Sequence, residues 1–152
     1  MYSRVRSILA VLVVAASGIG LAHAQTQPAA ASSGLGQSWP NATDVSMSPN
    51  YHVYVFQRGA TRYVQVNDST GKVRGAVART PYALLGTPVG SDAGNVATPD
   101  EPLPVAASTA GETVYKDATM QVVVAPQADG TMRLMAAQPD CKSASDCTAK
   151  GP

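Results

Sequence analysis

The histidine at position 52 is the residue in this chain best suited to chemistry. It stands in the stretch "YHVYVFQRGATRYVQVND", among aromatic and amide side chains. Imidazole can act as a general base, but catalysis then needs a nucleophile within reach and a carboxylate that orients the ring. Aromatic rings and amides can instead stack on a sugar or hold a protein partner. The candidate binding face consists of His52, Tyr54, Phe56, Tyr63, Gln65 and Asn67.

The rest of the sequence offers little for catalysis. It contains no G-x-S-x-G motif, no H-E-x-x-H motif and no glycine-rich phosphate loop. Its two glutamates, Glu101 and Glu112, lie in or beside a proline-containing loop, which gives poor support to a pair of catalytic carboxylates. We therefore expect a binding or interaction module without a cofactor or metal. The alternative is a small hydrolase that uses His52 with a nearby Ser, Thr or Asp.

The first 24 residues have the three parts of a secretory signal peptide. Arg4 and Arg6 form a basic start, "ILAVLVVAASGIGL" is an apolar run, and "AHA" is a small-residue cleavage signature. The apolar run has 14 residues, whereas a membrane-spanning helix needs roughly 20. We expect cleavage after Ala24, a periplasmic or secreted protein, and no membrane span in the mature chain. Cleavage removes one of the two histidines and leaves His52.

Charge is nearly balanced over the whole chain but not along it. The chain has 11 Lys+Arg and 10 Asp+Glu, so it lacks the excess positive charge of a nucleic-acid-binding protein. Residues 51–80 carry five cations and one acid, whereas residues 81–152 carry four cations and eight acids. Either the two regions attract each other within one fold, or the cations face an anionic envelope polymer or an acidic partner. The candidate basic patch consists of Arg58, Arg62, Lys72, Arg74 and Arg79.

Two strands must position the His52 cluster. On either side of Gly59-Ala60, valines alternate with aromatic and polar residues, and this period of two is typical of half-buried strands. Glycine at the first central position fits a type II′ hairpin turn. That turn pairs His52 with Asn67, so that the valines face one side and the candidate binding face the other. Trp39, on a preceding arm, is the residue that could cover this second face instead.

Further strands extend the pattern into a mostly β fold. "DSTG" predicts a turn with Gly71 in the left-handed conformation, followed by a strand over residues 72–78. "TVYKD", "MQVVVAP" and "TMRLMAA" predict a second meander with the same order of strands and turns, which fits an internal duplication or simply two meanders. We expect antiparallel meanders that form a small sheet, a sandwich or an open barrel. A homodimer across an exposed strand edge would add stability.

Composition and cysteine usage define the organisation of the chain. In an exported chain, Cys141 and Cys147 predict a structural disulfide, since a redox pair is usually spaced C-x-x-C and zinc needs further ligands. Small polar residues at the N-terminus predict a disordered leader. The predicted parts are a signal peptide at 1–24, a leader at 25–38, a single β domain at 39–137 with a proline-rich loop near 90–112, and a disulfide-bearing tail at 138–152.

Three stretches carry a resemblance to a group of proteins. "GQSWPNATDVS", "YHVYVFQRG" and "YVQVND" resemble segments of small exported proteobacterial proteins of unassigned function. The resemblance covers most of the mature chain. It implies export and a small domain, and it implies no catalytic residue, cofactor or partner.

Overall fold

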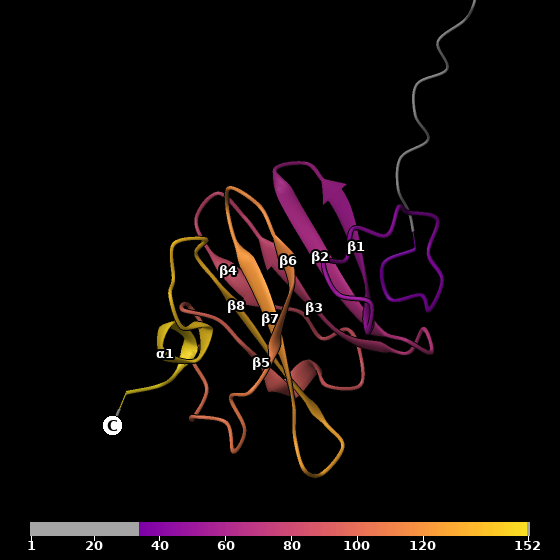
Figure 1. The fold of residues 1–152 in the computed structure, drawn as a ribbon. Helices are drawn as coiled ribbons and strands as arrows, with labels where there is room; N and C mark the ends of the chain where they lie inside the picture. Colours follow the sequence, from indigo (N-terminus) through magenta and orange to yellow (C-terminus); the bar gives the residue numbers. More distant parts are fainter. Residues whose placement is uncertain (1–33, 152) are drawn as a thin grey trace, which may run out of the picture.

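The computed structural model describes residues 34–151. The predicted signal peptide and residues 25–33 of the predicted leader lie outside the described residues. Two four-stranded sheets share one hydrophobic core, so the mostly β prediction is confirmed and the fold is a sandwich. Figure 1 shows the two sheets and a short helix at one side. Neither sheet closes into a barrel within residues 34–151.

Sheet 1 is an antiparallel meander in the order β1-β2-β3-β4. The predicted hairpin register is confirmed, because His52 pairs with Asn67 and Val55 with Val64. Gly59 has a φ of 58°, and no non-glycine residue between 34 and 151 has a positive φ, as a type II′ turn at Gly59-Ala60 requires. The strands are β1 Tyr51–Arg58, β2 Thr61–Asp68, β3 Val73–Arg79 and β4 Leu84–Gly86.

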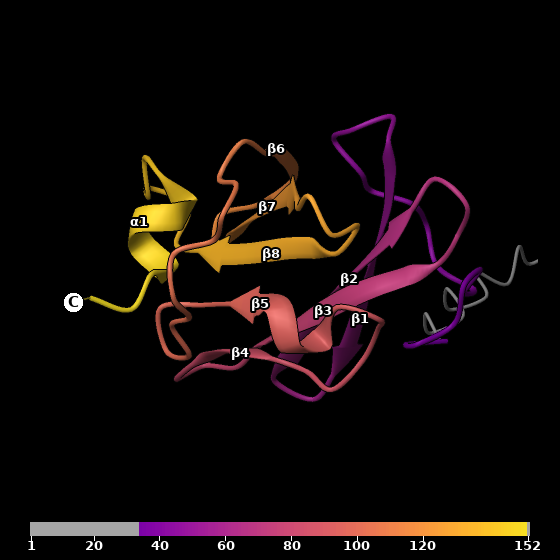
Figure 2. The same cartoon turned by 90° about the horizontal axis from the view of Figure 1, so that it is seen from below.

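Sheet 2 has the order β5-β8-β7-β6, and its three long strands form the predicted second meander. Its fourth strand, β5, pairs in parallel with β8, so that Val96 lies opposite Leu134. Figure 2 shows β7 and β8 in one layer and β2 and β3 in the other, with β5 beside β8. The strands are β5 Val96–Ala97, β6 Glu112–Lys116, β7 Gln121–Pro126 and β8 Met132–Ala137.

The two meanders contain equivalent turns. Gly71 and Gly130 adopt left-handed conformations, with φ of 86° and 81°. The N–H of Gly71 donates to the Asp68 carbonyl at 2.9 Å, and that of Gly130 donates to the Gln127 carbonyl at 3.0 Å. Glycine is favoured at such positions because it lacks a Cβ. The prediction for Gly71 is therefore confirmed, and the second meander repeats the same turn at Gly130.

The core lies between the sheets and is made of small aliphatic side chains. Three of the four valines predicted to face inward are fully buried, and Val55 packs against them while partly exposed. Valines of β6 and β7 and Leu134 of β8 supply the opposing layer. The buried core residues of sheet 1 are Tyr51, Val53, Val64, Val66, Val77 and Leu84.

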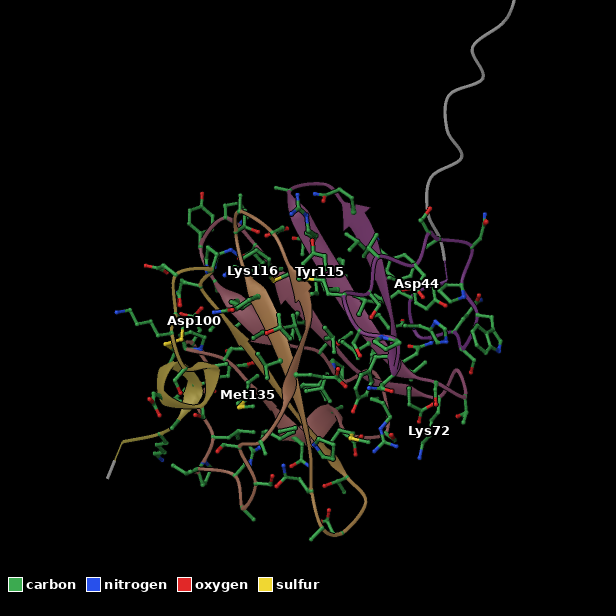
Figure 3. The ribbon with its side chains drawn as sticks, viewed as in Figure 1. Asp44, Lys72, Asp100, Tyr115, Lys116 and Met135 are labelled. Carbon is green, nitrogen blue, oxygen red and sulfur yellow. A yellow bond between two sulfur atoms is a disulfide. The ribbon has the colours of Figure 1, made fainter. Side chains whose placement is uncertain are left out.

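The proline-rich loop near 90–112 is more ordered than its composition suggests. It contains a 3₁₀ turn, η1 Ala93–Asn95, and strand β5. Both β5 residues are buried, and this burial offsets the entropy lost when the segment becomes ordered. After β5, the carboxylate of Asp100 (labelled in Figure 3) accepts a hydrogen bond from Leu84 N at 2.6 Å, and Glu101 accepts one from Gly86 N at 2.7 Å. These carboxylates occupy the outer edge of β4, where a second copy would otherwise pair.

The tail packs against part of the outer face of sheet 2. The predicted Cys141–Cys147 disulfide is present. A short helix, α1 Ala144–Thr148, packs against β8; the sequence did not indicate it. The Gln121 side chain donates to the Cys141 carbonyl at 2.6 Å, and the N–H of Lys150 donates to the carbonyl of Leu103 at 2.8 Å. The tail is therefore part of the fold.

Candidate functional site

The predicted binding face of β1 and β2 is largely buried. Tyr54, Phe56, Gln65 and Asn67 are buried, whereas His52 and Tyr63 are partly exposed. Cross-strand pairing brings all six side chains to one face, as predicted. The structure therefore assembles these residues but leaves only part of them accessible.

The chain segment before β1 covers part of this face, and we call it the arm (residues 34–50). Gln65 Oε1 accepts a hydrogen bond from Gly36 N at 2.6 Å, and Gln65 Nε2 donates to the Gln37 carbonyl at 2.8 Å. Asn67 Nδ2 donates to the Ser38 carbonyl at 2.7 Å. Buried amides satisfy their hydrogen bonds in this way. The domain thus includes residues 34–38, which composition assigns to the leader.

Asp44 fastens the arm to β1 and orients His52. Its Oδ2 lies 2.7 Å from His52 Nδ1, and its Oδ1 accepts hydrogen bonds from Ser46 N at 3.0 Å and Val53 N at 2.9 Å. Burial raises the pKa of Asp44, but the hydrogen bonds from Val53 N–H and His52 outweigh burial and hold the pKa below its usual value. Sequence reasoning missed Asp44; the "DVS" pattern of an Asx turn was the available signal.

His52 lies in an aromatic setting. Its ring centroid is 5.2 Å from that of Trp39, edge to face, and 6.4 Å from that of Tyr54. The Asp44–His52 pair is two thirds of a catalytic triad. Among residues 34–151, however, no hydroxyl group is hydrogen-bonded to the His52 ring. The geometry orients an imidazole without supplying a nucleophile.

Exposed apolar side chains concentrate on the arm. Of the six large hydrophobic side chains that are exposed in the described part of the chain, four lie between residues 34 and 50. Trp39 is 61% exposed. Its ring also packs against Gly71 in the β2–β3 turn, because a Cβ added to Gly71 would lie 2.5 Å from the ring. The four residues are Leu35, Trp39, Val45 and Met47.

The arm bridges the edge strands of the two sheets. Val45 N donates to the Val53 carbonyl of β1 at 2.8 Å, and Met47 N donates to the Val114 carbonyl of β6 at 2.8 Å. At the end of the arm, Ser48 Oγ donates to a Glu112 carboxylate oxygen at 2.7 Å. Figure 3 labels Asp44, a residue of the arm, beside sheet 1. The four exposed side chains therefore project from a segment whose backbone is hydrogen-bonded to both sheets.

The five cations of the candidate basic patch do not form one surface. Arg74 of β3 is buried, and its Nε lies 2.7 Å from Asp92 Oδ2. Its Nη2 donates to the Gly130 carbonyl in the β7–β8 turn at 2.9 Å. Lys72 is exposed in the β2–β3 turn, at the opposite end of β2 from the β1–β2 turn. The remaining three, Arg58, Arg62 and Arg79, lie at the β1–β2 turn end.

Arg62 takes part in a clasp between the sheets. Its Nη1 donates to Asp117 Oδ2, which also accepts a hydrogen bond from Tyr115 Oη at 2.7 Å. Burial, together with the hydrogen bond to Asp117, raises the pKa of Tyr115 to about 12. Burial also raises the pKa of Asp117, but hydrogen bonds from Thr119, Tyr115 and Met120 outweigh it and lower the pKa to about 2. The basic region 51–80 and the acidic region 81–152 therefore attract each other through two ion pairs, Arg62–Asp117 and Arg74–Asp92.

No cluster of three or more His, Cys, Asp or Glu side chains in residues 34–151 is arranged to hold a metal ion. No helix in the same range has the length and apolar character needed to cross a membrane. Comparison with protein families, curated proteins and solved structures gave no match for this chain.

Proposed function

We propose that this protein is an exported binding module that recognises another exported protein or an envelope component through its arm. The observation that carries the proposal is the concentration of exposed apolar side chains on the arm. Exposed apolar side chains gathered on one part of a surface commonly mark an interaction site. Trp39 and His52 lie together there, and tryptophan is frequent at the energetic centre of interfaces.

The fixed backbone of the arm favours this role. Recognition by a loose segment costs the entropy of ordering it, whereas a segment that is already hydrogen-bonded avoids much of that cost. The arm is bonded to β1, β2 and β6. The disulfide in the tail is consistent with an oxidising compartment, which supports export.

Site-specific photocrosslinking in intact cells tests this function. A photoreactive amino acid at Trp39 or Met47 is expected to give a discrete adduct with a partner. Val105 provides the control, because it is 68% exposed and lies outside the arm. Equal adducts from position 105, or none from either arm position, would contradict the proposal.

A hydrolase that uses His52 is the second candidate, and one distance favours it. The 2.7 Å contact between Asp44 and His52 supplies the orienting carboxylate that the sequence did not indicate. If His52 is a general base, His52→Ala should slow hydrolysis of a simple activated ester by about 100-fold or more. Equal rates for the parent and the variant would remove this candidate.

A further inference from the structure

The β1–β2 turn end of the sandwich carries polar side chains where the core stops. Residues opposite one another on paired strands share a face. Arg62 lies opposite Gln57 on β1 and opposite Arg79 on β3. The buried Val64 is two positions further along β2 on the same face. Gln57, Arg62 and Arg79 therefore continue the inward face beyond the apolar core, at the open rim between the sheets.

This polar row lines a surface hollow. The hollow has a volume of about 280 Å³, and its walls include Gln57, Arg62, Arg79 and Thr119. Thr119 belongs to the β6–β7 turn, so both sheets contribute to the walls. The volume is somewhat below that of drug-sized ligand pockets, which begin at roughly 300 Å³. It suits a charged group and part of a sugar ring.

The two arginines that line the hollow differ in their hydrogen-bonding partners. Arg62 is fixed by Asp117, whose oxygens already accept hydrogen bonds from Tyr115 and Thr119. The Arg79 side chain has no hydrogen bond or ion pair with any residue between 34 and 151. Its guanidinium donors are therefore free to bind a ligand.

Neighbouring charges add to the positive potential at this end. Arg58 ends β1, and Lys116 ends β6 immediately before Asp117. Figure 3 labels Lys116 and Tyr115 in the upper part of the molecule, towards the end where Figure 1 shows the β1–β2 turn. Arg62 and Arg79 thus line the hollow beside the single Asp117 carboxylate, whereas Arg58 and Lys116 lie at the ends of neighbouring strands without lining it. This excess of positive charge favours an anionic ligand.

We propose that the rim hollow binds the oxyanion of an anionic sugar, with Arg79 as its principal ligand. A guanidinium presents two parallel N–H donors that match the oxygens of a phosphate or carboxylate. Pro81 lines the hollow. The next residue in the chain, Tyr82, is 95% exposed. Its ring is available to stack on the sugar. This site is separate from the arm and does not depend on the function proposed for it.

Titrations followed by NMR of the isotope-labelled mature protein test the oxyanion site. The probes are glucose 1-phosphate, glucuronate, inorganic phosphate and glucose, at constant ionic strength. We expect the two anionic sugars to shift the signals of Arg79 Nε and the Thr119 amide, and glucose to leave them unchanged. Comparison of the phosphate with the carboxylate identifies the preferred oxyanion. Absence of binding by all three anions would overturn the proposal.

Matched charge removals separate a site from general attraction. Arg79→Gln is expected to raise the Kd of the preferred sugar anion about 10-fold or more, since a charged hydrogen-bonding partner is lost. Lys72→Gln removes the same charge from an exposed side chain outside the hollow, and its effect should stay below about 2-fold. Equal effects of the two variants would overturn the site. Arg79→Lys, which keeps the charge without the paired donors, should bind more weakly than the parent even if Arg79→Gln folds poorly.

A third variant tests the contribution of the sugar. Tyr82→Ala should weaken glucose 1-phosphate or glucuronate binding by about 2-fold to 10-fold, the range of an aromatic contact, and should leave inorganic phosphate binding unchanged. If inorganic phosphate binds as tightly as both sugar anions and Tyr82→Ala has no effect, the assignment to a sugar is overturned.

Discussion

The outer faces of the two sheets are covered in different ways. The arm lies over part of sheet 1 and the tail over part of sheet 2, and each is held by a buried glutamine. Gln65 Nε2 donates to the Gln37 carbonyl of the arm at 2.8 Å, and Gln121 Nε2 donates to the Cys141 carbonyl of the tail at 2.6 Å. In both sheets, therefore, a glutamine side-chain amide holds the covering segment by a hydrogen bond to its backbone carbonyl.

The difference lies in what reinforces each cover. The Cys141–Cys147 bridge closes a short loop in the tail, and such a loop stabilises by roughly 2 kcal/mol on the entropic model. The arm depends on Asp44, on Trp39 and on backbone bonds to β1 and β6. Segments without covalent closure open at lower free energy. The arm is thus the cover more readily opened, and it also carries most of the exposed apolar side chains.

Val64→Asp should give the largest effect, because it attacks the core that both sheets share. Val64 is fully buried between them. A carboxylate placed there would lack a partner, and a buried charge without a partner costs about 3–5 kcal/mol, a large share of the roughly 5–15 kcal/mol of a typical domain. We expect both sheets to unfold together, measured by thermal melts followed by circular dichroism.

His52→Ala is the matched control on the same hairpin. His52 points to the other face, and its side chain is 30% exposed. Loss of its contact with Asp44 should cost about 1 kcal/mol or less, as for other surface pairs. A Val64→Asp variant that melts like the parent would show that the shared core has been placed on the wrong face.

Asp117→Asn should have an intermediate effect, because it cuts the clasp between the sheets. The folded pKa of Asp117, about 2, lies below the unfolded value of about 3.9. Its ionised form therefore stabilises the fold above pH 4, and this contribution disappears as the pH falls towards 2. We expect the variant to lose about 1 kcal/mol at pH 7, after allowance for solvent screening.

Urea unfolding at pH 7, 4 and 2 measures this difference. The gap in unfolding free energy between the parent and Asp117→Asn should be full at pH 7, slightly smaller at pH 4, close to the unfolded pKa, and much smaller at pH 2. Asp129→Asn is the control, since Asp129 also accepts hydrogen bonds from a threonine in its turn but forms no ion pair among the described residues. A gap that stays unchanged at pH 2 would argue against the clasp.

The paired variants Gln65→Leu and Gln121→Leu test the two covers directly and should have the smallest effects on global unfolding, because the loss falls on segments that can open while the core stays folded. Each removes buried hydrogen bonds, at about 1–3 kcal/mol. In Gln65→Leu we expect faster hydrogen exchange of the Gly36 amide and of the arm. In Gln121→Leu the tail should exchange less, because the disulfide and the Lys150–Leu103 bond persist.

Hydrogen exchange with mass spectrometry, with and without reduction of the disulfide, measures both variants. Reduction should bring the exchange of the tail in Gln121→Leu closer to that of the arm in Gln65→Leu. Equal opening of the two segments with the disulfide intact would mean that covalent closure does not distinguish them.

The sequence by itself determined the local features of this protein. Turn chemistry at Gly59-Ala60 and Gly71 defined the first hairpin and its register, and the period of two placed the valines on the core face. The spacing of Cys141 and Cys147 indicated their disulfide. These features depend on neighbouring residues, whose conformational preferences a sequence displays directly.

Only the tertiary structure decided which of these surfaces remain accessible. The parallel pairing of β5 with β8, the burial of Arg74 and the contact of Asp44 with His52 join segments whose partners no local pattern specifies. The same holds for the arm, whose composition resembles a linker until the Gln65 amide is available to bind it. Burial and pairing depend on which distant segments meet, so the rim hollow and the arm emerge only once both sheets share a core.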